Sequence, residues 1–188
     1  MAGTQLEDKI ICNIELVEII TEGITPKTYY FDTAEEATYS PTVSEGKEDV
    51  KRIKNRIAAI NRTEDIQYGS SITLKDNSFS PEVLEVVDGG TVKKTSDKIT
   101  GYTGSPSGTT VARKPFTLNL YTSEKSTSGG SINYYKFSYP NCKGTPAKFS
   151  FKDGEFMTPE YTIVSRPSKG AAPFDIDIVQ ALPNVIKS

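Results

Sequence analysis

The segment SPEVLEVVDGG, residues 80–90, carries the clearest secondary-structure signal in the chain. Ser80 can accept a hydrogen bond from a free backbone amide, Pro81 suits the first helical turn, and Glu82 favours the positive end of the helix dipole. The glycine pair Gly89-Gly90 ends the helix. We therefore predict one short α-helix over about residues 80–88, and none of its side chains is chemically reactive.

Around this helix the sequence has the patterns of β-strands. Eight segments are rich in β-branched and aromatic residues and are separated by turn residues such as Asp153-Gly154. They are residues 9–20, 27–32, 66–74, 115–122, 132–139, 147–152, 159–165 and 174–179. Strands at this spacing predict a mainly β fold, a β-sandwich or partial barrel, in a single domain over residues 1–188. Residues 101–110 and 123–131 contain few apolar side chains, and we predict surface loops there.

The long polar stretch between residues 33 and 65 fits two structures. Its aliphatic residues recur at the intervals of an amphipathic helix, at Val50, Ile53, Ile57 and Ile60. A strand is also compatible, because a period of two places one group of residues on one face, Ile53, Asn55, Ile57 and Ala59, and a basic group on the other, Arg52, Lys54 and Arg56. Residues 34–41 would then form the partner strand across a turn near Ser44-Glu45-Gly46. Periodicity alone leaves both structures open.

The charge balance argues against broad classes of binding protein. The chain has 188 residues, of which 22 are basic and 24 acidic, and its net charge is −2. General binding to nucleic acid or to an anionic membrane needs a clustered positive field rather than a balanced surface. Residues 1–8 contain neither a basic leader nor an apolar run, and no segment approaches the roughly 20 apolar residues of a membrane helix. We expect a protein with no membrane partner that folds in the cytoplasm, with Cys12 and Cys142 as free thiols.

The absence of histidine argues against most hydrolase mechanisms. Without it there is no Ser-His or Cys-His nucleophile and no histidine-based metal site. Paired carboxylates remain, but adjacent ones in a strand, as in Glu35-Glu36 and Glu64-Asp65, point to opposite faces. Asp175 and Asp177 share a face and alternate with Phe174, Ile176 and Ile178 as in a half-buried strand, so we expect both carboxylates to face solvent. We predict no catalytic residue, no metal site and no cofactor, and hence no enzyme.

A series of short motifs runs through most of the chain. In the N-terminal half they are Thr33-Ala34-Glu35-Glu36, Ser44-Glu45-Gly46, Lys54-Asn55, 62–69, 74–77, 81–84 and Asp88-Gly89-Gly90. In the C-terminal half they are Ala147-Lys148-Phe149, 154–163 and Ser165-Arg166-Pro167. In order and spacing this series resembles the major tail tube proteins of long-tailed, siphophage-type bacteriophages and prophages.

The resemblance implies a β-sandwich or partial barrel of the phage tail tube type, with one short helix and a structural role in the virion. Such proteins assemble into hexameric rings, which stack into the tail tube through which phage DNA is ejected. The implied partners are further copies of the same chain, a tape measure protein, a tail terminator, and DNA in transient passage through the lumen. The implied location is the tail of the virion, after assembly in the cytoplasm of the host bacterium.

The resemblance also favours strands for the polar stretch, as a long β-hairpin over about residues 32–62 that joins neighbouring copies into an inner barrel. Closure around a ring would satisfy the N–H and C=O groups of its edges. One face would line the lumen, with Glu36, Thr38, Ser40, Arg52, Lys54 and Arg56. The other face would pack outward on the domain, with Ala37, Tyr39, Ile53 and Ile57. A lining of mixed charge would hold DNA less than a purely basic one, which would bind its phosphates.

Two other kinds of function compete with this interpretation. A carbohydrate-binding or adhesion module would use tyrosines as stacking platforms, and Tyr29-Tyr30 and Tyr134-Tyr135 are the candidates. Alternation places one tyrosine of each pair inside the protein, and the chain has no tryptophan, so packing roles are favoured. A carboxylate-based hydrolase is the other competitor. Within phage tails, a tail terminator, a minor tail protein and the tube of a contractile particle are alternatives.

Overall fold

The computed structural model describes residues 8–185, which form thirteen strands and one helix. The strands are β1 (Ile11–Thr21), β2 (Thr28–Phe31), β3 (Ala34–Ser44), β4 (Glu48–Ile53), β5 (Arg56–Arg62), β6 (Ile66–Asp76), β7 (Thr91–Thr95), β8 (Lys98–Thr103), β9 (Phe116–Lys125), β10 (Ser131–Gly144), β11 (Lys148–Ser150), β12 (Thr158–Ser165) and β13 (Asp175–Val179). The helix is α1 (Pro81–Val87). The predicted mainly β fold with one short helix is confirmed.

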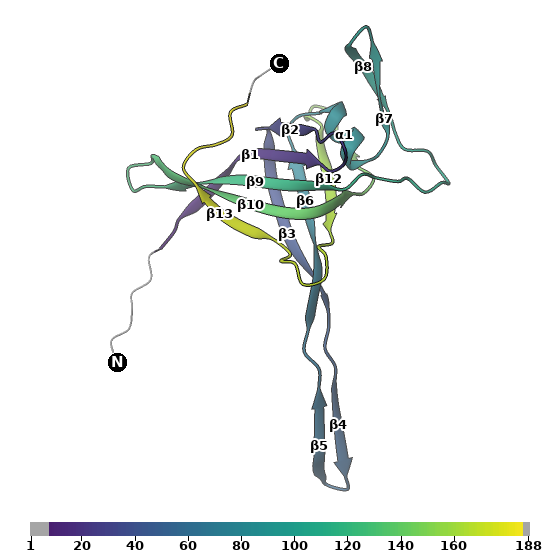
Figure 1. The fold of residues 1–188 in the computed structure, drawn as a ribbon, viewed down its shortest axis with the longest axis vertical. Helices are drawn as coiled ribbons and strands as arrows, with labels where there is room; N and C mark the ends of the chain where they lie inside the picture. Colours follow the sequence, from purple (N-terminus) through teal and green to yellow (C-terminus); the bar gives the residue numbers. More distant parts are fainter. Residues whose placement is uncertain (1–7, 186–188) are drawn as a thin grey trace.

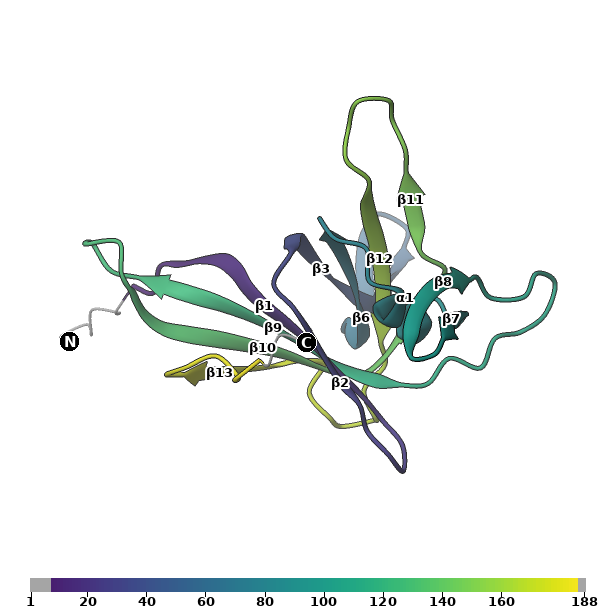
Figure 2. The same cartoon turned by 90° about the horizontal axis from the view of Figure 1, so that it is seen from above.

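Nine of the strands form one antiparallel sheet that folds into two layers. Its main order is β2-β1-β9-β10-β12-β6-β3, with β13 added to β10 and β11 added to β12. The layers meet through β10, because its earlier part pairs with β9 and β13 whereas its end, Cys142 to Gly144, pairs with β12. Figures 1 and 2 show the strands of the β1-β9-β10 layer crossing those of the β3-β6-β12 layer. This arrangement is the predicted sandwich or partial barrel.

The hydrophobic core lies between these layers and beneath the helix. The first layer contributes fully buried residues such as Val17, Ile19 and Leu118, and the second contributes Leu74 and Tyr161. In β6 and β12 buried residues alternate with partly exposed ones, as the period of two requires. Helix α1 closes one end of the core with Val83, Leu84 and Val87. The body of the protein is therefore a two-layered core with a helical lid.

The start of the helix differs from the prediction in one respect. Ser80 has the extended backbone of an N-cap residue, and its carbonyl oxygen accepts a hydrogen bond from the Leu84 amide at 3.1 Å. Its hydroxyl, however, makes no capping hydrogen bond within the described chain. The predicted helix is confirmed, and the predicted role of the Ser80 side chain is wrong.

Two predicted loops contain more strand than expected. β9 continues to Lys125, which leaves only a short turn before β10. Strands β7 and β8 form an exposed hairpin that overlaps the first residues of the predicted 101–110 loop. This hairpin turns at Ser96 and Asp97, whose φ angles are 48° and 64°. Strongly polar strands lack the apolar alternation that reveals a strand in sequence, and the Ser-Asp turn is a weaker hairpin signal than Asn-Gly or Asp-Gly.

Candidate assembly surfaces

A long hairpin arm projects from the body of the protein (Figure 1). We define the arm as residues 47–63, with strands β4 and β5 joined at Lys54 and Asn55. The structure decides between the two alternatives for this segment, since it is a pair of strands and not a helix. The predicted pairing is wrong, however: residues 34–44 pair with β6, and β4 pairs with β5. The chain reverses at Lys54, whose φ is 51°, and not at Ser44-Glu45-Gly46.

The arm joins the body through a junction of side-chain hydrogen bonds. The Gly46 amide donates to Asp65 Oδ1 at 2.6 Å, and the Lys47 amide donates to Thr63 Oγ1 at 2.8 Å. A Cβ atom on Gly46 would lie 1.9 Å from the carbonyl oxygen of Thr63. The close approach of the two backbones therefore requires glycine at position 46.

The arm buries none of its strand residues. Every residue of β4 and β5 is exposed, including the aliphatic residues Val50, Ile57 and Ile60 at 39%, 59% and 57%. Residues 47–63 also carry six basic and two acidic side chains. An isolated two-stranded hairpin is at best marginally stable in water. The arm therefore presents both aliphatic and basic side chains that the body does not cover.

The body part of the predicted lumen face is polar and continuous. Glu36, Thr38 and Ser40 lie opposite Lys75, Thr73 and Ser71 of β6 in the register. The lysine amine lies 2.5 Å from a Glu36 carboxylate oxygen. The hydrogen bond and charge of Lys75 lower the pKa of Glu36, although exposure and solvent screening keep the contribution to stability small. A lumen role for these three residues stays a prediction.

The opposite face of β3 packs on the protein core. Ala37 lies across from Leu74 and Tyr39 across from Ile72, and both β3 residues contact the core cluster. The Tyr39 ring also stacks on Tyr139, with 5.7 Å between ring centroids. The separation of polar and apolar side chains in β3 therefore follows the period of two.

At the tip of the arm the predicted separation of faces is wrong. Arg52 lies directly opposite Ile57, and Ile53 lies opposite Arg56. Directly opposed residues of an antiparallel pair share a face, so each face of the tip carries both a basic and an aliphatic residue. The cause is a register shift between Lys51 and Arg52. The prediction assumed strict alternation of faces and so did not include such a shift. Ile53 and Ile57 are 46% and 59% exposed and so do not pack on the body.

Strand β13 presents a second exposed surface at the edge of the other layer. Asp175 and Asp177 face solvent as predicted, and Asp177 forms an ion pair with Lys136 at 2.8 Å. Ile176 and Ile178 are also exposed, at 49% and 61%, so the prediction of a half-buried strand is wrong. The strand lies beyond β10 at the margin of the sheet, where the core no longer covers either face.

An aromatic cluster on the β11–β12 side of the body was not predicted. Phe79, Phe149 and Phe151 form it, with 6.4 Å between neighbouring ring centroids, and Phe156 in the following loop is wholly exposed. Lys148 and Lys152 flank the rings and pair with Glu160 and Glu155. Sequence alone assigns such phenylalanines to the core. The turn residues Asp153-Gly154 are the only signal that they lie on a projecting loop.

Asp88, at the end of the helix, fixes the base of the β7–β8 hairpin. Its carboxylate accepts a hydrogen bond from the Tyr102 hydroxyl at 2.6 Å and from the amide of Ala147 at 3.3 Å. Its carbonyl oxygen accepts from Arg113 Nε at 2.9 Å. The Tyr102 hydroxyl in turn accepts from the Gly90 amide. This buried carboxylate has a structural task, since it links the helix, the hairpin and the start of β11.

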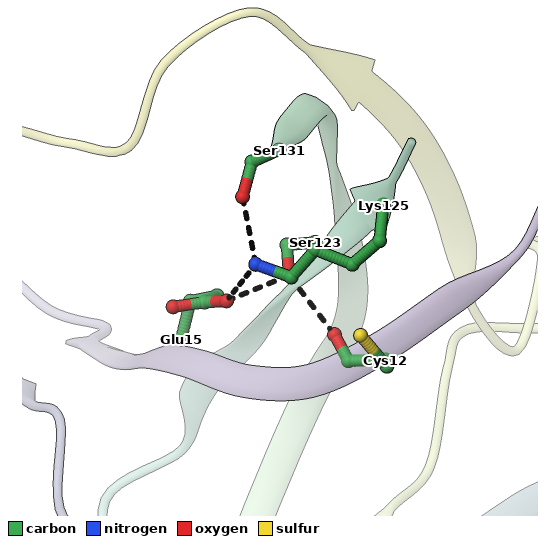
Figure 3. A network of polar contacts seen from close by, with 5 residues as sticks. All are labelled: Cys12, Glu15, Ser123, Lys125 and Ser131. Carbon is green, nitrogen blue, oxygen red and sulfur yellow. Dashed lines mark hydrogen bonds and ion pairs between the residues drawn. The ribbon is translucent and has the colours of Figure 1, made fainter. Parts of the chain in front are cut away.

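A second polar network joins strands β1, β9 and β10 (Figure 3). Ser123 donates a hydrogen bond to a Glu15 carboxylate oxygen at 2.6 Å, and Lys125 lies 3.5 Å from the same oxygen and 2.8 Å from Ser131 Oγ. The hydrogen bond from Ser123 lowers the pKa of Glu15 and outweighs its partial burial. The network ties together strand ends that contain bulges, and its groups are arranged to hold strands in register.

The two cysteines are free thiols, as predicted. Cys12 is exposed and Cys142 is buried, and burial raises the pKa of the Cys142 thiol to about 12. Within residues 8–185 no group of three or more Cys, Asp or Glu side chains is placed to hold a metal ion. No helix in this part of the chain has the length and apolar content to cross a membrane.

Comparisons with known proteins gave structural similarities only. No protein-family model matches the chain, and no curated protein matches it. The chain is similar to one in a cryo-EM structure of the anti-feeding prophage (AFP) baseplate, with 10% identity, coverage of 95% and 98% of the two chains, and a TM-score of 0.40. It is also similar to one in the sheath-tube complex of an extracellular contractile injection system, PVC, in the extended state, with 11% identity, coverage of 90% and 93%, and a TM-score of 0.47. A third similarity is to Hcp1 from Flavobacterium johnsoniae, with 12% identity, coverage of 88% and 99%, and a TM-score of 0.38.

Proposed function

We propose that this protein is the subunit of a tail tube of the long-tailed phage type, in which copies join into hexameric rings and the rings stack. The observation that carries the proposal is the arm. It exposes every residue of two strands, including aliphatic side chains whose contact with water is unfavourable in a monomer. The series of motifs described for the sequence supports the same assignment.

The polar face of the β3-β6-β12 layer supports the proposal from the body side. Thr38, Thr73 and Thr162 lie directly across from one another on the three strands. The acidic Glu36 and Glu160 flank Lys75 in the next row of this face. A lining with hydroxyl groups and both signs of charge would let DNA pass without a strong phosphate contact.

The remaining assignments follow from the resemblance in sequence. The tube would enclose a tape measure protein before DNA passes, and a terminator would close its end. Assembly would take place in the cytoplasm of the host bacterium, and the final location would be the tail of the virion. We propose no enzymatic activity and no cofactor for this protein.

The two tyrosine pairs expected for a carbohydrate-binding function do not form a suitable platform. Tyr135 is buried, and Tyr29 packs against the core cluster. Tyr30 and Tyr134 are only partly exposed. A sugar would need a flat aromatic face open to solvent, and neither tyrosine pair presents both rings in that way.

Assembly of the full chain at increasing concentration tests the proposed function. We expect light scattering to rise with concentration and negative-stain electron micrographs to show rings or tubes. The matched variant replaces residues 48–62 with a short Gly-Ser connection, which leaves β3 and its core contacts in place. We expect this variant to fold as a monomer and not to assemble. A full chain that stays monomeric over the whole concentration range would contradict the proposal.

A further inference from the structure

Strand β13 has an open edge with an acidic and aliphatic pattern. Its inner edge pairs with β10 between Tyr134 and Ser138, and no strand of residues 8–185 pairs with its outer edge. Asp175 and Asp177 alternate with Ile176 and Ile178, and all four side chains are exposed. An open edge that also exposes aliphatic residues is a template for the addition of a further strand.

The arm has the same apolar character and the opposite charge. Ile53 and Ile57 have exposures close to those of the β13 isoleucines, at 46% and 59% against 49% and 61%. The tip adds Lys51, Arg52, Lys54 and Arg56 with no acidic residue between them. In the described part of the chain none of these four cations forms an ion pair. Strands β4 and β5 pair only with each other there, so each has an open edge.

We propose that the arm of one copy adds as a strand to the outer edge of β13 in a neighbouring copy; the inference rests on the proposed function. Main-chain N–H and C=O groups of the two open edges would pair, as in other cases of strand addition. The basic side chains of the tip would lie near Asp175 and Asp177, and opposite charges across strands are favourable. The isoleucines of both elements would cover one another. The lengths agree, since β13 has five residues and the arm strands have six and seven.

The contact must be between copies and not within one chain. Figure 1 shows the tip of the arm pointing away from the body, on which β13 lies. Each copy therefore offers its arm to one neighbour and its β13 edge to another. Such a head-to-tail contact between two different surfaces closes a ring or extends a filament.

Exchange of charge between the two surfaces tests the inference. The arm variant carries Arg52→Glu and Arg56→Glu, and the strand variant carries Asp175→Lys, Asp177→Lys and Lys136→Glu. The last change preserves, in reversed form, the ion pair that residues 136 and 177 make within one chain. We expect each variant alone to raise the concentration needed for assembly by about tenfold or more. We expect the variant that combines all five changes to return to within about threefold of the unmodified chain.

A matched control separates this contact from a general effect of charge. Lys94→Glu with Lys98→Glu reverses the same number of cations on the other exposed hairpin, and we expect it to assemble like the unmodified chain. Equal loss of assembly in this control would overturn the inference. So would a combined variant that assembles no better than the separate ones, or a strand variant that assembles normally. If the unmodified chain forms neither rings nor tubes, it is the proposed function that fails.

Disulfide trapping gives a second measurement that does not depend on reversed charges. Ile57→Cys and Ile178→Cys, combined in a Cys12→Ser background, should give a ladder of covalent oligomers when the assembled protein is oxidised. Each cysteine alone should give at most dimers. Assembled protein that yields no ladder would overturn the inference even where a charge variant fails to fold.

Discussion

The β3–β6 ladder and the arm are two parts of one continuous hairpin, but only the first part has a buried face. Ala37 and Tyr39 of β3 pack on the core, and Ile72 and Leu74 of β6 are fully buried. Beyond the junction at Gly46 the two strands of the hairpin continue as β4 and β5, in which every residue is exposed. One part of the hairpin packs on the protein's own core, whereas nothing in the described chain covers the other part.

Truncation of matched aliphatic residues should show this difference most strongly. Leu74→Ala removes a fully buried side chain, and we expect the free energy of unfolding to fall by about 2–5 kcal/mol. Ile57→Ala removes an exposed side chain of the arm, and we expect a change within about 0.5 kcal/mol in the monomer. Urea denaturation of dilute monomer measures both. Similar losses for the two variants would mean that the arm folds back on the body in solution.

Added methyl groups at two glycines should separate the stability of the body from that of the arm. A Cβ atom at Gly69 would lie 2.5 Å from the carbonyl oxygen of Ser165 in the body, so we expect Gly69→Ala to lower global stability by about 1–3 kcal/mol. Gly46→Ala produces its clash at the junction, with Thr63. We expect this change to speed amide hydrogen exchange in β4 and β5 while the urea midpoint of the body stays the same. A lowered midpoint for Gly46→Ala would show that arm and body unfold as one unit.

Asp76 should make the buried part of the hairpin sensitive to pH. This carboxylate is fully buried, and although Thr33 donates to its Oδ1, its Oδ2 has no hydrogen-bond partner in the described chain. Desolvation by burial raises its pKa above the ordinary value of 3.8. The folded state therefore binds this proton more tightly than the unfolded chain does. Protonation of Asp76 then stabilises the fold at acid pH, and this stabilisation is lost as the pH rises through the raised pKa of the folded state. Asp76→Asn should remove this pH dependence, and Glu36→Gln should not; denaturant midpoints between acid and neutral pH test both.

The smallest expected effect is that of Ser80, a residue of the body whose side chain, like those of the arm, contributes little to the stability of the monomer. Because the Ser80 hydroxyl makes no capping bond, Ser80→Ala should change the unfolding free energy by less than about 0.5 kcal/mol. Asp88→Ala at the other end of the helix removes bonds to Tyr102 and Ala147 and should cost about 1–3 kcal/mol. A clear loss in the Ser80 variant would show that the hydroxyl caps the helix in solution.

Local patterns are enough to predict the helix and most strands, whereas the two faces of β3 follow from the resemblance together with the period of two. Pro81 and Gly89-Gly90 mark the helix ends by their own backbone preferences, and Ala37 and Tyr39 alternate with polar residues because one face is buried. Strand pairing could not be predicted in this way. Residues 34–44 pair with β6, although the whole arm lies between the two strands in the sequence. This pairing depends on the core that the two strands share and not on nearby sequence.

The candidate surfaces were predicted less completely than the fold. A single register shift near Lys51 mixes the faces of the arm tip, and no local signal marks it. The exposure of Ile176, Ile178 and the aromatic cluster was missed for a different reason. An aliphatic or aromatic residue has the same sequence pattern whether its own core or another molecule covers it, and only the folded chain distinguishes the two.

The way β6 is held in the body also determines how the protein responds to mechanical force. The arm continues the direction of β3 and β6 (Figure 1), so tension on its tip pulls both strands lengthwise out of the body. That movement slides β6 along β12, to which it is paired from Ser70 to Lys75. Hydrogen bonds between antiparallel strands run perpendicular to the strands, so a lengthwise pull loads all of them in shear at once. A sideways pull would instead peel them apart one pair at a time. The attachment of the arm to the body should therefore resist a pull along the arm far better than a sideways pull.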